Sequence, residues 1–367
     1  MIRIALFTSF AFITACTSNA NIDDQPGNQR LTPHSDLALV LTSNFDSSSL
    51  DVFDPSNPTL LAKRLVLVSG DAVLTRASGI PIIIDRGRYE TLTVLGEQLN
   101  VTKQFRLLRC GPHDLASVGP HLAFVTCYDS SNMRVVDTQT GETKQVVNLF
   151  PWADADGIPE ADHVIRFNDY LLVTIQGLNR NNVFTPTAHG LVLRMRISED
   201  RIAEGISTAE LPCANPFTPW VRTGSSLVVG CAGFRASGQS AIVSIVPETL
   251  AMTTLATEAT LGGIPHEIAA GQNGDLIVLI SVPKTTASDD PDPIEAQEMR
   301  LIRLDSNGKI DILHTSLGYS LTGLAVIGDT IYFGNRSNDS NAGLWWIDAN
   351  GTHGPVKTSM PPYVIVP

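Results

Sequence analysis

The sequence lacks the positive charge that a nucleic-acid-binding protein needs. It contains 25 lysines and arginines against 37 aspartates and glutamates, which gives a formal net charge of −12. Because contacts to phosphate depend on a basic face, this balance argues against a nucleic-acid partner. An acidic surface by itself indicates no more than solubility or cation binding.

Helical periodicity is nearly absent, and so are the common catalytic motifs. Without apolar residues at helical spacing, repeat folds built from helix pairs are excluded. The sequence contains no nucleophile elbow, Walker loop, dinucleotide-binding fingerprint or HExxH metal motif. The sequence therefore indicates an all-β protein whose function no short linear motif reveals.

The apolar run at the N-terminus, residues 4–15, is too short to span a bilayer. It follows Arg3, the one positive charge of this region, and has the form of an export signal. The run ends Ile13-Thr14-Ala15-Cys16, which resembles the bacterial lipobox. That resemblance implies cleavage before Cys16 and lipidation of its sulfur and new amino group. An ordinary signal peptide with an unrelated cysteine is the alternative.

The residues after this motif predict a membrane tether. Thr17, rather than aspartate, follows the cysteine, which resembles lipoproteins sent to the outer membrane. The following polar residues show no apolar periodicity. We expect a signal peptide at 1–15, a lipidated cysteine and flexible tether at 16–35, and one folded domain at 36–367. The protein would then be an outer-membrane lipoprotein of the cell envelope, facing the periplasm or the cell surface, with the membrane as a partner.

What the sequence does contain is a repeat. Seven β-prone apolar runs occur at residues 37–44, 81–86, 121–128, 170–177, 226–233, 275–282 and 330–337. Most are preceded by a short first strand and a tight turn rich in Gly, Asn or Asp. Their spacing matches four-stranded propeller blades with loop insertions.

The two ends of the chain predict how the ring closes. The first repeat lacks its first strand, and residues 362–366 look like that strand without a second one after it. Pairing them would leave no free sheet edge. The predicted fold is therefore an all-β, seven-bladed β-propeller of four-stranded blades, closed by the C-terminal strand completing the N-terminal blade.

The third repeat carries a resemblance to a known family. Residues 113–143, HDLASVGPHLAFVTCYDSSNMRVVDTQTGET, resemble the YVTN-type repeat of bacterial seven-bladed propellers of the surface-layer and periplasmic branch. The seventh repeat, GLAVIGDTIYFGNRSNDSNAGLWWIDANG, is recognisable, and the others are degenerate. The resemblance implies a propeller fold and a binding platform, but no single activity.

Four further cysteines occupy repeated places. Cys110 precedes the first strand of the third blade and Cys127 ends its second strand, and Cys213 and Cys231 have the same places in the fifth blade. In an antiparallel pair these strand ends lie side by side, and an exported chain is oxidised, so we expect two disulfides. Each would contribute about 3 kcal/mol. A cysteine-rich metal site is the alternative, although no CxxC motif occurs.

The loop lengths distinguish the two ends of the ring. In a propeller, loops that enter a first strand and loops that leave a second strand lie at the same end. The long segments 150–163, 177–189 and 283–298 all fall there, and we call this end the long-loop face. The other end, with its short turns, is the tight-turn face. Long loops are usually functional or disordered, so we expect binding on the long-loop face. The alternative is that these loops have lengthened without acquiring a function.

Histidines and carboxylates open several of the innermost strands on the long-loop face. The candidate binding residues at this mouth of the central channel are His113, Asp114, Asp162, His163, His266, Glu267 and Tyr363. An imidazole beside a carboxylate can bind a metal or exchange protons with a ligand. Hydrogen bonding between blades is the structural alternative.

One segment partly resembles a calcium loop of the DxDG kind. Asp154, Asp156 and Glu160 supply oxygen ligands around a glycine turn. The segment departs from an EF-hand because Trp152 occupies the first ligand position and His163 stands where a bidentate glutamate belongs. We expect no cofactor apart from calcium at these three residues.

Three functions are compatible with these features. The favoured one is a monomeric, lipid-anchored binding or scaffold propeller that takes a protein, peptide or glycan on its long-loop face. The second is a propeller enzyme, lactonase- or lyase-like, which requires the histidines and carboxylates of the channel mouth to converge within a few ångströms. The third is a calcium-stabilised structural propeller.

Overall fold

The computed structural model describes residues 37–367, except residues 88, 183, 199–200, 234–238, 284–295 and 319. These residues belong to the unit Pro33–Pro367. The predicted signal peptide, the lipidated Cys16 and the tether lie outside the described residues. Within the part of the chain that is described, no helix has the length and apolar character needed to cross a membrane.

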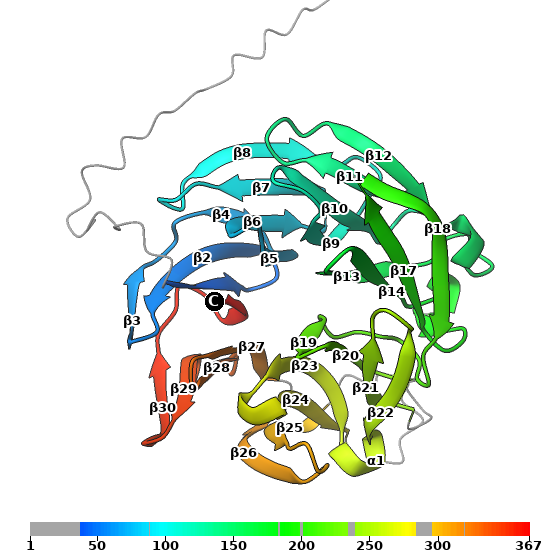
Figure 1. Ribbon diagram of the computed structural model, residues 1–367. Coiled ribbons are helices and arrows are strands. Elements are labelled where there is room, and N and C mark those ends of the chain that lie inside the picture. The colour runs from blue at the N-terminus through cyan, green and yellow to red at the C-terminus, as the bar shows by residue number, and fades with distance from the viewer. Residues whose placement is uncertain are drawn as a thin grey trace, which may run out of the picture. The chain divides into compact units, whose positions relative to one another are not determined.

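Seven antiparallel four-stranded sheets surround a common axis as the blades of a propeller (Figure 1). Blade 1 contains β31 (Pro362–Val366), β1 (Ala38–Ser43), β2 (Ser47–Asp54) and β3 (Asn57–Ala62). Blade 2 contains β5 (Ala72–Ala77), β6 (Ile80–Asp85), β7 (Thr91–Leu95) and β8 (Val101–Arg106). Blade 3 contains β9 (Pro112–Ser117), β10 (Leu122–Cys127), β11 (Asn132–Asp137) and β12 (Thr143–Asn148).

The other four blades follow in chain order. Blade 4 contains β13 (Ala161–Phe167), β14 (Tyr170–Ile175), β17 (Leu191–Ser198) and β18 (Arg201–Glu210). Blade 5 contains β19 (Val221–Thr223), β20 (Ser226–Cys231), β21 (Ala241–Val246) and β22 (Ala251–Thr257). Blade 6 contains β23 (Ile264–Ala270), β24 (Leu276–Pro283), β25 (Ala296–Leu304) and β26 (Ile310–Leu317). Blade 7 contains β27 (Leu321–Ile327), β28 (Thr330–Asn335), β29 (Gly343–Asp348) and β30 (Gly351–Val356).

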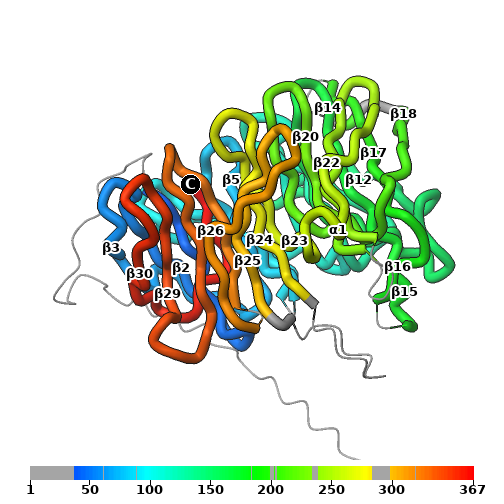
Figure 2. The backbone as a smooth tube through the Cα atoms, turned by 90° about the horizontal axis from the view of Figure 1, so that it is seen from below, coloured from blue at the N-terminus to red at the C-terminus, as the bar shows by residue number. Residues whose placement is uncertain are grey.

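Short elements decorate this frame. The strand β4 (Leu67–Ser69) pairs with β2, and β15 (Leu178–Asn179) pairs with β16 (Thr185–Pro186) in a hairpin. The short helices are η2 (Phe150–Trp152), η3 (Arg180–Asn182), α1 (Glu258–Leu261) and η4 (Gln272–Gly274). Figure 2 views the ring edge-on and shows the β15–β16 hairpin projecting from one edge.

The ring closes as the sequence predicts. Strand β31 pairs antiparallel with β1, with Val366 opposite Leu39 and Val364 opposite Leu41. The C-terminal strand thus supplies the innermost strand of the N-terminal blade. The predicted fold class, a seven-bladed propeller closed in this way, is confirmed.

The apolar runs of the second strands are explained by burial on both sides of each blade. In β6, Ile82, Ile83 and Ile84 are 1%, 1% and 0% exposed, although successive side chains point to opposite faces of a strand. Each face is covered by a neighbouring blade. Burial of one such side chain stabilises the fold by roughly 1.5–3 kcal/mol.

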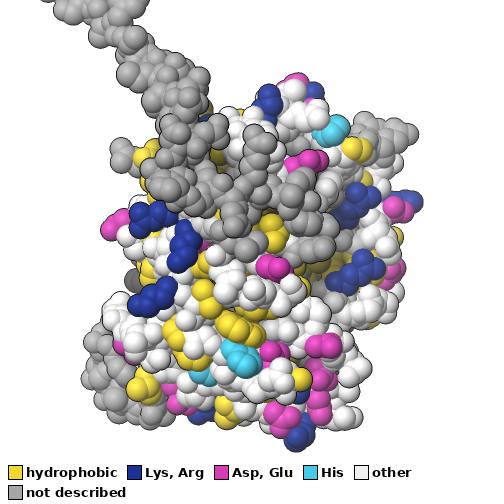
Figure 3. All heavy atoms as spheres, turned by 90° about the vertical axis from the view of Figure 1, so that its left-hand side faces the viewer, with side chains coloured by type: hydrophobic (Ala, Val, Ile, Leu, Met, Phe, Trp, Pro, Cys, Tyr) yellow, Lys and Arg dark blue, Asp and Glu magenta, His cyan; other side chains and the backbone are white. Residues whose placement is uncertain are grey.

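The hydrophobic core therefore lies between the blades. One cluster packs Phe124 and Met133 of blade 3 against Leu171 and Leu193 of blade 4. The other described clusters join neighbouring blades in the same way. The outer surface, seen in Figure 3 from the side of β3 and β30, carries charged side chains of both signs.

Both predicted disulfides are present. Cys110 is bonded to Cys127 with a Cα–Cα distance of 4.4 Å, and Cys213 to Cys231 with a distance of 6.0 Å. Each bond ties a loop that enters a first strand to the end of the second strand of the same blade. Two loops of the long-loop face are thereby fixed to the frame.

Candidate functional site

Irregularities in strand pairing position the predicted channel-mouth residues. Near the start of β9 and of β13, the pairing register with the second strand shifts. There the backbone N–H of Asp114 donates to Thr126 Oγ1 at 2.9 Å, and that of His163 donates to Thr174 Oγ1 at 3.0 Å. Bulges of this kind re-aim side chains beside functional sites. The strand β13 begins at Ala161, so Asp162 and His163 lie within it.

Two His–Asp pairs cross the boundary between blades 3 and 4. His163 Nδ1 lies 3.1 Å from Asp114 Oδ2, and His113 Nδ1 lies 2.5 Å from Asp162 Oδ1. The contact between His113 Nδ1 and Asp162 Oδ1 is short enough for an ion pair but does not have the geometry of a hydrogen bond. Asp162 Oδ1 also lies 3.7 Å from His163 Nε2. Four of the seven predicted residues thus form one group, which we call the His–Asp cluster.

Arg86 of blade 2 joins this cluster to the closing strand. Its Nη1 lies 3.2 Å from His113 Nε2, and its Nη2 donates to the hydroxyl of Tyr363 at 3.1 Å. Asp71 holds the guanidinium in an ion pair at 2.7 Å. Because a guanidinium only donates hydrogen bonds, His113 Nε2 must accept, and the ring proton of His113 faces Asp162. Tyr363, a fifth predicted residue, is therefore linked to the cluster through Arg86.

Tyr128 and Gln176 complete the support of the cluster. The ring of Tyr128 stacks on His113 with 4.6 Å between ring centroids, and its hydroxyl lies 2.7 Å from Gln176 Oε1. Gln176 Nε2 donates to Asp162 Oδ2 at 2.7 Å. Arg86, Tyr128 and Gln176 escape prediction from the sequence. They share one signal, since each directly follows the second strand of its blade.

His266 and Glu267 do not join the cluster. His266 Nε2 lies 2.7 Å from Ser281 Oγ, and burial lowers the pKa of His266 to about 4. The Glu267 carboxylate accepts the backbone N–H groups of Gly323 and Leu324 at 2.7 Å each, which ties blade 6 to blade 7. Burial raises the pKa of Glu267 to about 7 against these two hydrogen bonds. The sequence alternative of hydrogen bonding between blades therefore describes Glu267, whereas His266 bonds to Ser281 within blade 6.

The electrostatics of the cluster favour a charged His163. Burial opposes its charged form, but Asp162 and Asp114 outweigh burial and raise the pKa of His163 to about 8. Burial also opposes the charged form of Asp162, yet His163 and His113 hold the pKa of this carboxyl below its ordinary value. At neutral pH, His163 is therefore an imidazolium between two carboxylates.

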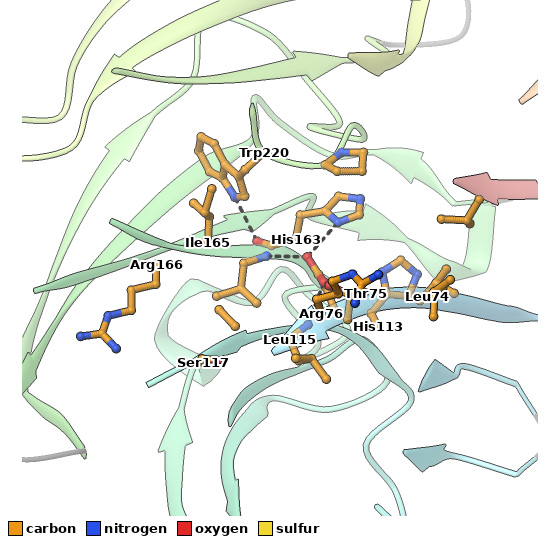
Figure 4. A pocket seen from close by; sticks show the side chains of 16 residues that line it. Leu74, Thr75, Arg76, His113, Leu115, Ser117, His163, Ile165, Arg166 and Trp220 are labelled. Carbon is orange, nitrogen blue, oxygen red and sulfur yellow. Dashed lines mark hydrogen bonds and ion pairs between the residues drawn. The ribbon is translucent and has the colours of Figure 1, made fainter. Parts of the chain in front are cut away.

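A cavity of about 490 Å³ extends from the cluster along the innermost strands (Figure 4). Consecutive residues of β5, β9 and β13 line it, including those from His113 to Ser117 and from His163 to Arg166. The edges of these strands therefore face the cavity. Trp220 forms part of the wall, and its Nε1–H donates to the His163 carbonyl oxygen at 3.2 Å.

The segment predicted to bind calcium is held by other contacts. Glu160 is buried, accepts the backbone N–H of Leu178 at 2.9 Å and pairs with Arg180 Nε at 2.8 Å. Burial raises the pKa of Glu160 to about 6. Asp154 and Asp156 each accept the backbone N–H two residues further on. No three His, Cys, Asp or Glu side chains of the described residues are arranged to hold a metal ion, and calcium binding here stays a prediction.

Exposed aromatic side chains occur on the long-loop face. The large exposed aromatic side chains of the described chain are Phe45 (65%), Tyr89 (52%), Phe150 (61%), Phe184 (48%) and Phe217 (42%). All five lie in loops that leave a second strand or enter a first strand. The described turns of the tight-turn face carry no exposed aromatic side chain of this size.

Some of these rings are held by their neighbours. The ring of Phe45 lies edge-on to Tyr363 at 5.8 Å, and the Arg336 guanidinium lies 4.5 Å from the Phe45 ring centroid. The Arg180 guanidinium lies 5.6 Å from the Phe184 ring centroid. These contacts fix the rings while leaving much of each ring exposed.

Comparison with known proteins identifies the fold. No protein-family model and no curated protein sequence matches the chain. A catalytically inactive virginiamycin B lyase from Staphylococcus aureus, solved with quinupristin, is similar at 15% identity and a TM-score of 0.55, over 84% of this chain and 94% of that one. The dihydro-heme d1 dehydrogenase NirN, solved with DHE, is similar at 14% identity and a TM-score of 0.54, over 93% of this chain and 77% of that one.

Hydrazine synthase from Kuenenia stuttgartiensis is similar at 12% identity and a TM-score of 0.54, over 74% of each chain. At these identities the likeness shows the fold alone. The structure and its neighbours together show a seven-bladed β-propeller. The resemblance to YVTN-type lipoproteins stays a prediction.

Proposed function

We propose that this protein is a binding module that docks a protein partner on its long-loop face. The observation that carries the proposal is the confinement of the exposed aromatic side chains to loops of that face. Aromatic residues are enriched in protein interfaces and supply most of their hot spots. Exposed rings cost free energy in water, and the position of all five in loops of one face supports an interaction surface there.

The kind of ring favours a protein over a glycan. Four of the five exposed aromatic side chains are phenylalanines, which have no polar group at the ring edge. Tyrosine and tryptophan combine an apolar ring with a hydrogen-bond donor and suit a partly wet surface. Phenylalanine gains most when it enters a dry apolar pocket, as the side chains of a protein partner provide.

The loops of this face are organised before any partner binds. Two disulfides tie loops to blades 3 and 5. Arg180 joins η3 to the frame through Glu160, and through Asp129 at 2.7 Å. A surface that is already ordered avoids part of the entropy cost of association. With the lipidated Cys16 predicted by the sequence, the proposed protein is an envelope-anchored propeller that presents this face to its partner.

Acid–base catalysis in the channel is a second candidate function. One observation favours it: Asp114 holds Nδ1 of His163, a residue that lines the cavity. A carboxylate that orients an imidazole in this way is a recurring part of proton-transfer sites. Proteins of similar fold include a lyase and a dehydrogenase by name. The five predicted residues that assemble at the channel mouth would then act on a substrate.

Site-specific photo-crosslinking in cells tests the docking proposal. A benzoylphenylalanine at position 184 should form one dominant protein adduct. Because a hot-spot residue contributes roughly 2 kcal/mol, Phe150→Ser in the same chain should reduce adduct yield more than tenfold. The matched control is Ile312→Ser, which changes a 57% exposed residue on the outer strand β26. No adduct at position 184, or equal yields with both serine variants, would overturn the proposal.

A further inference from the structure

The central cavity is bounded by the edges of strands. The strands β5, β9 and β13 are each the terminal strand of their sheet, and consecutive residues of all three line the cavity. The edge of a terminal strand carries backbone N–H and C=O groups that have no neighbouring strand to bond to. The cavity wall therefore offers backbone hydrogen-bonding groups to a ligand.

The pairing of β13 with β14 determines which backbone groups of β13 face the cavity. Val164 donates its backbone N–H to Asp114 Oδ2 of blade 3 at 3.1 Å, so its backbone groups point away from β14. In an antiparallel pair, the groups of every second residue point to the same side. Arg166, two residues further along β13, therefore also directs its N–H and C=O away from β14, toward the cavity that it lines. Three groups form this edge of β13: the C=O of Val164 and both backbone groups of Arg166.

The charged side chains beside this edge are engaged by the protein itself. Arg76 donates to three main-chain oxygen atoms. Arg166 donates its Nε–H to the carbonyl oxygen of Asn168 at 3.0 Å, and His163 Nδ1 lies 3.1 Å from Asp114 Oδ2. An uncharged ligand leaves all of these contacts intact. The wall therefore favours a ligand that brings hydrogen-bonding groups without a net charge.

The rest of the wall suits apolar side chains and a carbonyl group. Apolar surface comes from Leu115, Ile165, Trp220 and Val364. The indole N–H of Trp220 is occupied by the His163 carbonyl oxygen, so its ring acts as apolar wall (Figure 4). His163 Nε2 lies 3.7 Å from Asp162 Oδ1, which is too long for a hydrogen bond. The Nε2–H of the imidazolium is therefore a donor for a carbonyl oxygen of a ligand.

We propose that the central cavity binds a short, uncharged peptide in an extended conformation, which adds to the inner edge of β13 as a further strand. One peptide residue exchanges two hydrogen bonds with Arg166, and the residue two positions further on donates its N–H to the Val164 carbonyl oxygen. The lining segment of β13, from His163 to Arg166, matches a peptide of about four residues at ~3.3 Å per residue.

The size of the cavity agrees with a ligand of this kind. Its volume of about 490 Å³ lies within the range of small-ligand pockets, roughly 300–1,000 Å³. The peptide site is separate from the exposed aromatic side chains of the long-loop face. The two proposals therefore do not depend on each other.

The test uses the capped peptide acetyl-Thr-Val-Thr-Val-amide, whose β-branched residues favour an extended backbone, and the same peptide methylated on every backbone nitrogen. Binding to the isotope-labelled, folded chain is followed by NMR titration. We expect saturable binding of the first peptide and about tenfold or weaker binding of the methylated one, because its N–H donors are lost. The Arg166 amide signal should shift and exchange with solvent more slowly in the complex, whereas that of Arg196, an exposed residue of β17, should not change.

A pair of substitutions at one position isolates the backbone contact. Arg166→Pro removes the N–H that faces the cavity and keeps the hydrogen bonds to β14, so it should weaken peptide binding about fivefold. The matched control, Arg166→Ala, loses the same side chain but keeps the N–H, and should weaken binding less than about twofold. Thermal unfolding of both variants establishes that they fold.

The Arg166 amide signal of the wild type decides the matter if Arg166→Pro does not fold. Failure of the peptide to bind, equal binding of the two peptides, an unchanged Arg166 amide, or equal effects of the two substitutions in folded variants would each overturn the proposal.

Discussion

Replacing Asp114 with asparagine tests the electrostatics of the His–Asp cluster. Asparagine keeps the size of the side chain and an oxygen that can accept the backbone N–H of Val164, now at 3.1 Å from Asp114 Oδ2. The change removes the negative charge that faces His163, and it replaces Oδ1, which accepts the backbone N–H of Leu115 at 2.7 Å, with an amide nitrogen. We expect the pKa of His163 to fall while the fold is retained.

The expected size of the fall in the pKa of His163 follows from the two carboxylates that stabilise its imidazolium form. The pKa of His163 rises from 6.5 to about 8, which corresponds to about 2 kcal/mol of preference for the charged form. Asp162 acts across 3.7 Å, and Asp114 acts through a hydrogen bond at 3.1 Å. If each supplies roughly half of the effect, Asp114→Asn lowers the pKa of His163 by about 1.

The same values predict how stability depends on pH. The folded state raises the pKa of His163, so its stabilising contribution is complete below pH 6.5 and is lost as pH rises through about 8. The free energy of unfolding should therefore fall more steeply between pH 6.5 and 9 in the wild type than in Asp114→Asn.

The assay is an NMR titration of the histidine Cε1–H signals between pH 5 and 10, with His163→Gln to assign the resonance. Urea unfolding at pH 6 and pH 9 gives the linked stabilities. Titration of His163 at or below pH 6.5 in the wild type, or an unchanged pKa in Asp114→Asn, would refute the reasoning.

Three further substitutions test what stabilises the propeller. Replacing Cys110 and Cys127 together with serine opens a loop with a sequence separation of 17, and the free energy of unfolding in urea should fall by about 3 kcal/mol; no change would count against the bond. Arg180→Ala leaves buried Glu160 without its ion pair, which should cost about 3–5 kcal/mol in the same assay, and a cost below about 1 kcal/mol would contradict the pairing. Burial raises the pKa of Glu267 from 4.5 to about 7. As pH rises from 4.5 to 7, the free energy of unfolding of the wild type should therefore fall by about 3 kcal/mol, and that of Glu267→Gln should not show this fall. Parallel pH profiles of the two proteins would refute this.

The fold was predictable because each blade repeats a local pattern. A second strand buried on both faces needs an uninterrupted apolar run, such as Ile82–Ile84, and the turns before these strands need Gly, Asn or Asp. The closing strand and the two disulfides followed from positions within that repeat. These features depend on neighbours within one blade, which the sequence places in order.

The site was only partly predictable because it depends on contacts between blades. His113 and His266 have the same place in their blades, but their neighbours differ. Blade 4 presents Asp162 to His113, whereas the corresponding bulge of blade 7 contains Thr322 and Gly323 and no carboxylate. His266 lies instead beside Ser281 of its own blade, and Glu267 binds the backbone N–H groups of Gly323 and Leu324. Arg86 was missed because nothing in its own blade indicates that it reaches His113.

The central claim is that the long-loop face docks a protein partner. Hydrogen–deuterium exchange of the chain, with and without the partner captured at position 184, measures this most directly. The account predicts slower exchange at residues 44–46, 150–160 and 176–182, with unchanged exchange at the tight turns 118–121 and 168–169. Protection confined to those tight turns, or no protection in the loops, would contradict it.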